Sequence, residues 1–355
     1  MRPVRVLIID DSATMRKIIG FALSNHPQIE VVGEAPDPTE AFRMVDTLDP
    51  DVLTLDIEMP KMNGIDFLRR VMKHRPRPVI MVSTLTLNGA AVTIEALAQG
   101  AFDCVAKPSL KDDRSFDDLV EKVIAAGAAR YGARQAPRAA AVPERAMPAA
   151  DMARIGEKII AIGASTGGVE ALIAVLTEFP ANCPPTVITQ HMPANFTRSF
   201  AERLDRLCRP TVQEADDRRP LLPGNVYIAP GGPCHLEVTR RGDGFDSRLR
   251  EADTVSGHRP SVDVLLSSVA TAAGRDAVGI ILTGMGKDGA EGMLRMRKAG
   301  ARTIGQDEAT SLIYGMPRVA QEMGAVQKQV ALNRIAREVF AGAASRREGI
   351  ASCHS

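Results

Sequence analysis

The segment Ile159-Ile160-Ala161-Ile162-Gly163-Ala164-Ser165-Thr166-Gly167-Gly168 decides how the second half of this chain folds. Its apolar, β-branched run predicts a buried strand, and the glycines predict a tight turn into a helix that begins near Val169. The stretch from Gly163 to Gly167 fits the Gly-x-Ser-x-Gly pattern of a nucleophile elbow, whose turn exposes a serine oxygen at the end of a strand. The amides that open the helix can then face a developing oxyanion.

A glycine-rich turn between a strand and a helix can also hold a phosphate or a dinucleotide. A phosphate loop needs Gly-Lys-Ser/Thr, whereas Val169 follows Gly168 here, and a dinucleotide turn needs a Gly-x-Gly pair that is missing. This segment alone leaves three interpretations open: a catalytic serine, an anion-binding turn and a purely structural turn.

The composition is that of an ordinary globular protein. The 355 residues are 45% hydrophobic and 25% charged, with a net charge of +1, and this length predicts two domains. The near-neutral charge gives no general attraction to nucleic acid or to anionic membranes. There is no apolar run of the roughly 20 residues that a membrane span needs, so we expect no insertion into a membrane. The five cysteines form no Cys-x-x-Cys pair and no signal peptide precedes them, which predicts reduced thiols and a cytoplasmic location.

The first half, residues 1–125, alternates apolar strands with helical segments. This alternation predicts a five-stranded, doubly wound parallel sheet of the flavodoxin-like α/β class. The expected strands are 4–9, 31–32, 51–56, 79–83 and 102–106, and the expected helices are 12–23, 39–48, 65–72, 90–98 and 116–129.

Polar residues stand at or just after the carboxyl ends of the strands of this sheet, and these ends meet at one edge. The residues are Asp10, Asp11, Asp56, Ser83 and Lys107. Three converging carboxylates repel one another unless a cation joins them, and hard oxygen ligands favour Mg²⁺. Asp56 could then accept a phosphoryl group, whose oxygens Ser83 and Lys107 would hold. The alternative is that the first aspartates only cap a helix and Asp56 is a solvated loop residue.

This half resembles the receiver domain of two-component response regulators. The resemblance covers about residues 3–125 and rests on Asp10-Asp11, on Asp56 with Met59-Pro60 and Gly64, on Ser83, and on Lys107-Pro108. It implies that a histidine kinase phosphorylates Asp56. It also implies that Asp11 and the backbone carbonyl of Glu58 complete the Mg²⁺ site. Many receivers carry an aromatic switch residue where this chain has Cys104, which puts signalling through a swinging ring in doubt.

Residues 126–154 are rich in Ala, Pro and Arg, and prolines interrupt any helical pattern. We expect a flexible linker that keeps two domains at high effective concentration. The tail, residues 346–355, carries no interpretable pattern.

The second domain, residues 155–345, again alternates strands and helices, which predicts a mostly parallel α/β sheet. The expected strands are 159–163, 186–189, 225–229, 277–282 and 303–305, and the expected helices are 169–176, 196–207, 262–272, 290–299 and 334–341.

Three strands of this domain end near Ser165, His191 and Asp288. A serine hydroxyl needs a base within hydrogen-bond reach, and the base needs an orienting carboxylate, so these residues predict a Ser-His-Asp triad. Their order differs from the Ser-Asp-His order of α/β-hydrolases, so that fold is not inferred. The competing bases and orienting groups are His235, His258, Asp263 and Asp307.

This half resembles the catalytic domain of CheB, the family of chemotaxis protein-glutamate methylesterases, over about residues 156–340. The shared blocks are 163–168, 190–193 with 196–197, 227–231, 259–263, 282–290 and 314–317. The resemblance implies that Ser165, His191 and Asp288 hydrolyse glutamate methyl esters on chemoreceptors and also deamidate receptor glutamines. It implies oxyanion donors in the backbone at Thr166 and Met285, and no cofactor for the esterase.

The fused receiver suggests regulation: unphosphorylated, it would cover the esterase mouth, and phosphorylation of Asp56 would favour an open state. The expected partners are methyl-accepting chemoreceptors and the pathway's histidine kinase, with the chain itself a monomer.

Two alternatives come from other classes of protein. A DNA-binding output would need a basic recognition helix, and the sequence contains none. A catalytically idle phospho-switch would only bind partners, which the intact triad argues against without excluding it.

Overall fold

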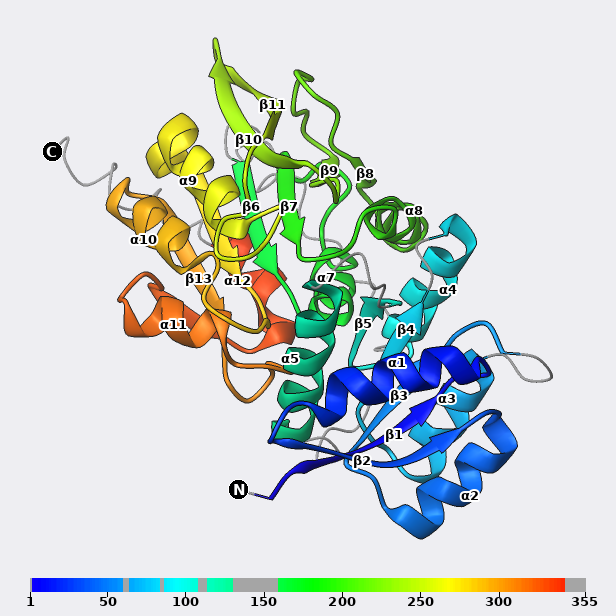
Figure 1. Cartoon of the computed structure of the whole chain (residues 1–355). Coiled ribbons are helices and arrows are strands. Elements are labelled where there is room, and N and C mark those ends of the chain that lie inside the picture. The colour runs from blue at the N-terminus through cyan, green and yellow to red at the C-terminus, as the bar shows by residue number, and fades with distance from the viewer. Residues whose placement is uncertain (1, 60–63, 84–85, 108–113, 130–158, 342–355) are drawn as a thin grey trace, which may run out of the picture. The chain divides into compact units, whose positions relative to one another are not determined.

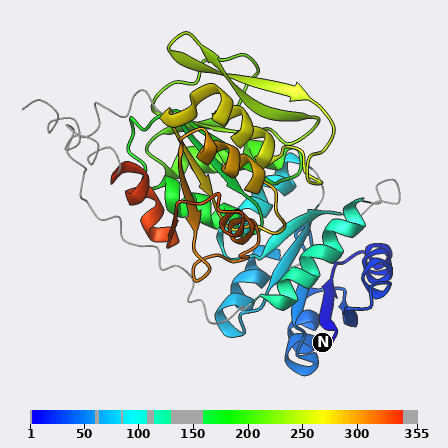
Figure 2. The same ribbon diagram turned by 90° about the vertical axis from the view of Figure 1, so that its left-hand side faces the viewer.

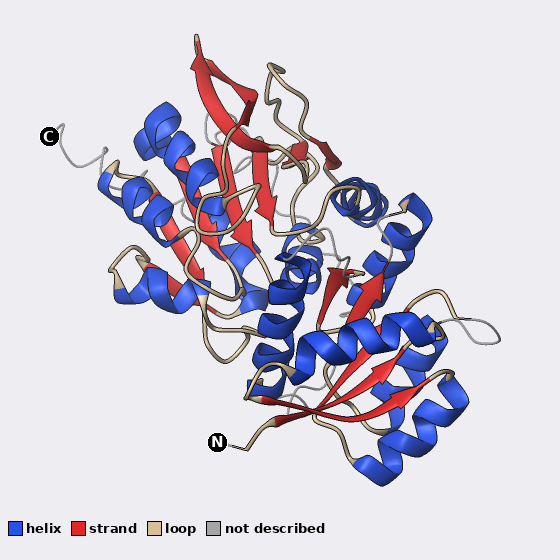
Figure 3. Cartoon of the chain, viewed as in Figure 1, coloured by secondary structure: helices blue, strands red, loops and turns tan. Residues whose placement is uncertain are grey.

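The computed structural model describes residues 2–59, 64–83, 86–107, 114–129 and 159–341, and the chain divides into two compact units (Figure 1). Pro60, Pro108, residues 130–154 of the expected linker and the tail 346–355 lie outside the described residues. In both units, helices flank a central sheet (Figure 3).

The first unit holds a five-stranded parallel sheet in the order β2-β1-β3-β4-β5. This is the flavodoxin-like order, whose switch point lies between β1 and β3. The strands are β1 Val4–Ile9, β2 Ile29–Ala35, β3 Val52–Asp56, β4 Val79–Ser83 and β5 Asp103–Ala106. The helices are α1 Ala13–Ser24, α2 Pro38–Leu48, α3 Gly64–His74, α4 Leu87–Ala98 and α5 Arg114–Ala128. The doubly wound fold expected from the alternation is therefore confirmed.

The second unit holds a seven-stranded sheet in which every pairing is parallel, in the order β14-β13-β12-β6-β7-β9-β8. The strands are β6 Ile159–Ala164, β7 Thr186–Gln190, β8 Thr211–Glu214, β9 Asn225–Ile228, β12 Ala277–Ile281, β13 Arg302–Gln306 and β14 Lys328–Val330. The central strand β6 is the apolar run of the opening segment, and all six of its residues are buried. Both faces of a parallel sheet are covered, which explains why this strand is apolar throughout.

Helices cover both faces of this sheet. They are α7 Gly168–Leu176, α8 Phe196–Leu207, α9 Val262–Ala273, α10 Ala290–Lys298, α11 Met316–Glu322 and α12 Ile335–Ala341. Figure 2 shows α9 and α10 side by side, and both pack against central strands of the sheet. The core on that face is continuous from Ile159 of β6 to Leu266 of α9 and Met293 of α10.

An antiparallel hairpin of β10 Cys234–Arg241 and β11 Gly244–Glu251 stands apart from the main sheet. This hairpin was not predicted from the sequence, although Leu236 and Val238 alternate with polar residues and a Gly-Asp loop joins the strands. Such a two-residue loop is a hairpin signal. The short strands β8 and β14 were also missed, and they are the two edges of the seven-stranded sheet.

The helix α5 includes residues 126–128, in agreement with the helix expected over 116–129, although the same residues also fall within the range expected for the linker. No helix in the described parts of the chain is long and apolar enough to cross a membrane.

Candidate active site

The predicted nucleophile, base and carboxylate stand at the carboxyl ends of three adjacent strands. Ser165 directly follows β6, and His191 directly follows β7. Asp288 lies in the loop after β12, which pairs with the other side of β6. The chain order changes direction across the sheet at β6, and ligands of open α/β sheets bind at such a switch point.

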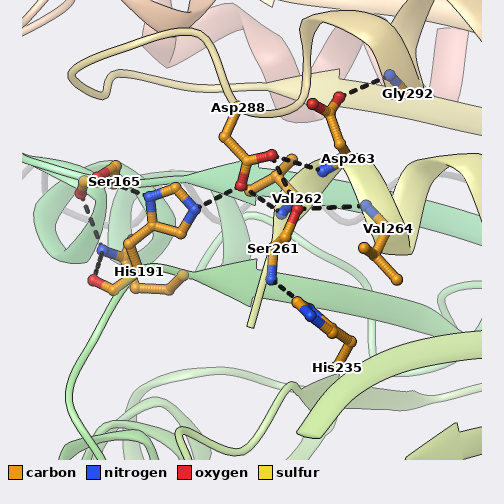
Figure 4. A network of polar contacts seen from close by, with 10 residues as sticks. Ser165, His191, His235, Ser261, Val262, Asp263, Val264, Asp288 and Gly292 are labelled. Carbon is orange, nitrogen blue, oxygen red and sulfur yellow. Dashed lines mark hydrogen bonds and ion pairs between the residues drawn. The ribbon is translucent and has the colours of Figure 1, made fainter. Parts of the chain in front are cut away.

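The structure brings these three side chains together (Figure 4). The Ser165 Oγ lies 3.1 Å from His191 Nδ1, and His191 Nε2 lies 2.8 Å from Asp288 Oδ2. A carboxylate only accepts hydrogen bonds, so Nε2 carries the proton of the neutral ring and Nδ1 is left to accept from the serine hydroxyl. Ser165 keeps 9% of its surface exposed, and Asp288 is buried. The arrangement provides a hydroxyl, a base that can take its proton, and a fixed carboxylate behind the base.

The start of α9 surrounds the Asp288 carboxylate with donors. Its Oδ1 accepts from Ser261 Oγ at 2.9 Å and from the Asp263 amide at 3.0 Å, and its Oδ2 accepts from the Val262 amide at 2.7 Å. Burial alone would raise the pKa of this carboxyl, but the bond and charge of His191 and the amides of α9 outweigh burial and lower it. Asp288 is therefore an ionised carboxylate that can stabilise an imidazolium.

The turn after β6 arranges the backbone near the nucleophile. Gly167 has φ +76°, and a Cβ there would lie 2.7 Å from Leu312 Cβ, so only glycine suits this position. The Ser165 amide donates to Thr283 O at 3.1 Å and so is not available to an oxyanion. A Cβ on Gly284 would lie 2.8 Å from Ser165 Cβ, so the backbone just before Met285 packs closely against the nucleophile. The assignment of the Thr166 and Met285 amides as oxyanion donors stays a prediction.

The rival residues occupy other places. The ring of His258 stacks on His191 with centroids 3.7 Å apart, and His235 is buried against Ser261. Asp263 accepts from the Gly292 amide at 2.7 Å, and Asp307 accepts from Thr310 at 3.0 Å. Among the described residues, the hydrogen bonds of His235, Asp263 and Asp307 lead to partners other than Ser165 and His191.

Sequence reasoning missed two residues that shape the site. Ser261 caps α9 and binds the Asp288 carboxylate, and a serine placed just before an apolar helical run could have signalled the cap. Gln190 donates from Nε2 to the Ser165 carbonyl at 2.9 Å and to the His191 carbonyl at 3.1 Å. Only the pairing of β6 with β7 brings Gln190 to the elbow.

The first unit gathers its predicted residues at the β1–β3 switch point. Carboxylate oxygens of Asp10, Asp11 and Asp56 all lie within 4.8 Å of one another. Lys107 Nζ lies 2.8 Å from Asp56 Oδ2 and 3.2 Å from Asp10 Oδ2. Burial and the charge of Asp56 raise the pKa of Asp10. Burial tends to lower the pKa of Lys107, but the hydrogen bond and charge of Asp56 outweigh it and raise that pKa.

The remaining predicted residues of this site lie beside it. Ser83 ends β4 and is buried, and its carbonyl accepts from the Lys107 amide at 2.8 Å. The Glu58 amide donates to Asp56 Oδ1 at 3.3 Å, so the Glu58 backbone lies close to the Asp56 carboxylate. A Cβ on Gly64 would lie 2.5 Å from the Asp56 carbonyl, so the approach of α3 requires glycine.

The donor set fits a magnesium ion. Asp10 Oδ2 is buried and makes no well-directed hydrogen bond, although Lys107 lies nearby. Two of the three clustered carboxylates are buried, and hard carboxylate oxygens are the ligands that Mg²⁺ prefers. Asp10, Asp11, Asp56 and the carbonyl of Glu58 would hold the ion.

The fold and the two sites define a class: a serine hydrolase of parallel α/β architecture joined to a phospho-acceptor domain. Family models agree with this division. Residues 160–339 match the CheB methylesterase family, and residues 6–122 match the response regulator receiver domain.

Similar proteins match along almost the whole chain. A protein-glutamate methylesterase/protein-glutamine glutaminase 1 from Rhizobium johnstonii is 58% identical over 98% of this chain and 99% of its own length. A protein of the same printed name from Caulobacter vibrioides is 56% identical over 98% of this chain and 100% of its own length. The crystal structure of the Thermotoga maritima CheB methylesterase catalytic domain superposes with a TM-score of 0.51 at 36% identity. That match covers 53% of this chain and 99% of that chain. The chain belongs to the CheB methylesterase family.

Proposed function

We propose that this chain is a phosphorylation-regulated protein-glutamate methylesterase that removes methyl esters from glutamates of chemoreceptors. The observation that carries the proposal is the continuous hydrogen-bonded line from Ser165 through His191 to Asp288. Two relatives that match this chain over nearly their full lengths are named protein-glutamate methylesterases. The reaction yields free glutamate and methanol. By removing methyl groups from chemoreceptors, the enzyme would act in the adaptation of chemotaxis.

The proposed reaction begins when Ser165 Oγ attacks the side-chain ester carbonyl of the methylated glutamate. His191 Nδ1 takes the serine proton, and the imidazolium that forms is stabilised by Asp288. The carbonyl oxygen, now negative, accepts hydrogen bonds from the Thr166 and Met285 amides. His191 returns the proton to the departing methoxide, which leaves as methanol, and a glutamyl-serine ester remains. Water, activated by the same histidine, then releases the glutamate.

The same steps can deamidate a receptor glutamine, with ammonia leaving in place of methanol. The printed names of the relatives include protein-glutamine glutaminase, which favours this second activity. No cofactor enters either reaction in this proposal.

Regulation is assigned to the first unit. Asp56 would accept a phosphoryl group from the histidine kinase of the pathway, and Lys107 and Ser83 would hold its oxygens. A Mg²⁺ held by Asp10, Asp11, Asp56 and the Glu58 carbonyl would supply positive charge that favours phosphoryl transfer. Phosphorylation would shift the population of the chain toward an esterase-active state. The cytoplasmic location and the monomeric state expected from the sequence stay predictions.

The test is methanol release from membranes that carry methylated receptors, with the wild type and Ser165→Ala, each with and without acetyl phosphate and Mg²⁺. Release that needs Ser165 and rises with the phosphodonor supports both parts of the proposal. Release that needs Ser165 but ignores the phosphodonor rejects the regulation. Absence of release from folded wild-type protein rejects the esterase and favours the idle binding module.

A further inference from the structure

The mechanism leaves unused a histidine that is completely buried behind the catalytic carboxylate. His235 lies on β10 with 0% of its surface exposed. Within the part of the chain that the structure describes, its ring has two hydrogen-bonding partners in the backbone. The amide of Ser261 lies 3.0 Å from Nδ1 (Figure 4). The carbonyl of Asp253 lies 2.8 Å from Nε2.

These partners determine the protonation state of the ring. An amide N–H can only donate, so His235 Nδ1 is an acceptor and carries no proton. A carbonyl can only accept, so Nε2–H is the donor toward Asp253. His235 is therefore a neutral imidazole of one tautomer, and it joins the end of the hairpin to the residue that caps α9.

Ser261 links this imidazole to the triad. Its amide is tied to His235, and its hydroxyl lies 2.9 Å from Asp288 Oδ1. The next amide, that of Val262, donates to Asp288 Oδ2, which is also the oxygen that holds His191 Nε2. A shift of Ser261 would therefore move donors on both carboxylate oxygens and change the position of the catalytic imidazole.

We propose that His235 is a positioning residue for catalysis: its Nδ1 holds the Ser261 amide, and through Ser261 it sets the Asp288 carboxylate in line with His191. The inference rests on the proposed esterase function of the Ser165 site. Across the described ranges of the chain, the hydrogen bonds of His235 lead to Ser261 and Asp253 and not to the triad itself. Its role depends on an acceptor at one ring position and not on the volume of the ring.

Two neutral variants of full-length protein separate these requirements. In His235→Asn the side-chain Oδ1 stands two bonds from Cβ, as Nδ1 does, and keeps an acceptor for the Ser261 amide. In His235→Gln that position is a carbon, while the amide nitrogen still reaches toward Asp253. The two variants thus differ in whether the side chain at position 235 can accept a hydrogen bond from the Ser261 amide.

Three measurements are made on the wild type and both variants. They are the rate at which a fluorophosphonate probe acylates Ser165, kcat and KM for methanol release, and the far-downfield proton resonance of the His191–Asp288 bond. We expect His235→Gln to lower acylation and kcat about 10- to 100-fold with KM unchanged, because small misplacements of catalytic groups cost this much. The downfield resonance should shift or broaden in this variant. His235→Asn should keep at least about a third of both rates and the wild-type resonance, since its acceptor remains.

Equal effects of the two variants on acylation and on the resonance overturn the proposal, because they would mean that His235 only fills space. If His235→Gln does not fold, Ser261→Ala takes its place: an unchanged resonance and acylation rate there would also overturn the link. A wild type that is acylated at Ser165 but releases no methanol rejects the esterase function alone. Acylation and the resonance would then still decide the role of His235.

Discussion

Replacing Asp288 by asparagine should disable the catalytic base while leaving the volume of the side chain unchanged. Each carboxylate oxygen accepts from at least two donors: Oδ1 from Ser261 Oγ and the Asp263 amide, and Oδ2 from His191 and the Val262 amide. In asparagine one of these oxygens becomes an NH₂ group. Whichever way the amide points, this group faces a backbone N–H that has lost its acceptor.

The effect on rate follows from the tautomer of His191. If the NH₂ group faces the ring, Nε2 must become the acceptor, and the proton moves to Nδ1, which faces Ser165 at 3.1 Å. A protonated Nδ1 cannot take the serine proton. In serine proteases this substitution lowers kcat by about 10⁴, which corresponds to about 5 kcal/mol of lost transition-state stabilisation. The unpaired buried amide should cost about 1–3 kcal/mol of folding stability.

The assay is methanol release together with acylation of Ser165 by a serine-directed probe. The matched control is Asp307→Asn, which changes the rival carboxylate at the end of β13 and should keep kcat within about threefold, since no change reaches the triad. Urea unfolding checks that both variants are folded. Asp288→Asn that is folded and keeps a tenth or more of the wild-type kcat would refute the orienting role of Asp288.

Three further predictions concern the acidic site, the pH dependence of stability and the packing of the central strand. Asp56→Asn should remove the rise in methanol release caused by acetyl phosphate and Mg²⁺, and chelation of the metal by EDTA should do the same to the wild type; a rise that survives either treatment contradicts the proposed site. Burial, helped by the charge of Asp288, raises the pKa of Asp263 from 3.8 to about 6. The folded state thus binds this proton more tightly than the unfolded state, and the wild type should lose the stability contributed by Asp263 as the pH rises through this interval. The free energy of unfolding of Asp263→Asn, measured with urea at several pH values, should lack this pH-dependent contribution. A pH dependence equal to that of the wild type would show that the pKa of Asp263 is not raised. Gly163→Ala should destabilise the chain by about 1–3 kcal/mol, because its new Cβ would lie 2.1 Å from Val262 Cγ1. Gly244→Ala, whose Cβ would meet only one atom at 3.8 Å, is the control, and equal urea midpoints for the two variants would contradict this packing argument.

The alternation of apolar strands with amphipathic helices was readable because both patterns are local. The strand Ile159–Ala164 is apolar at every position, and the structure places it in the middle of the second sheet. The helix from Phe196 to Leu207 has the bounds expected from its periodicity. Edge strands are short and partly exposed, so β8 and β14 carried too little apolar pattern to be recognised.

The hairpin was missed for a different reason. Charged side chains occupy much of β10 and β11, and Arg250 pairs with Glu237 across the two strands at 2.7 Å. So many charged residues in sequence are typical of a loop. The apolar face of the hairpin shows in the sequence only as an apolar residue at every second position.

By itself, the sequence determined the two parallel α/β domains and the residues at their strand ends: Asp10, Asp56 and Lys107 in the first, and Ser165, His191 and Asp288 in the second. This was possible because parallel strands deliver their carboxyl ends to one edge, so that strand position alone groups these side chains. Only the tertiary structure decided which strands are neighbours and what surrounds the carboxylate behind the base. The start of α9 reaches Asp288 because β12 pairs with β6, and His235 reaches Ser261 because the hairpin folds back over α9. Contacts between segments so far apart in the chain depend on packing across the whole domain, and no local pattern of residues encodes them.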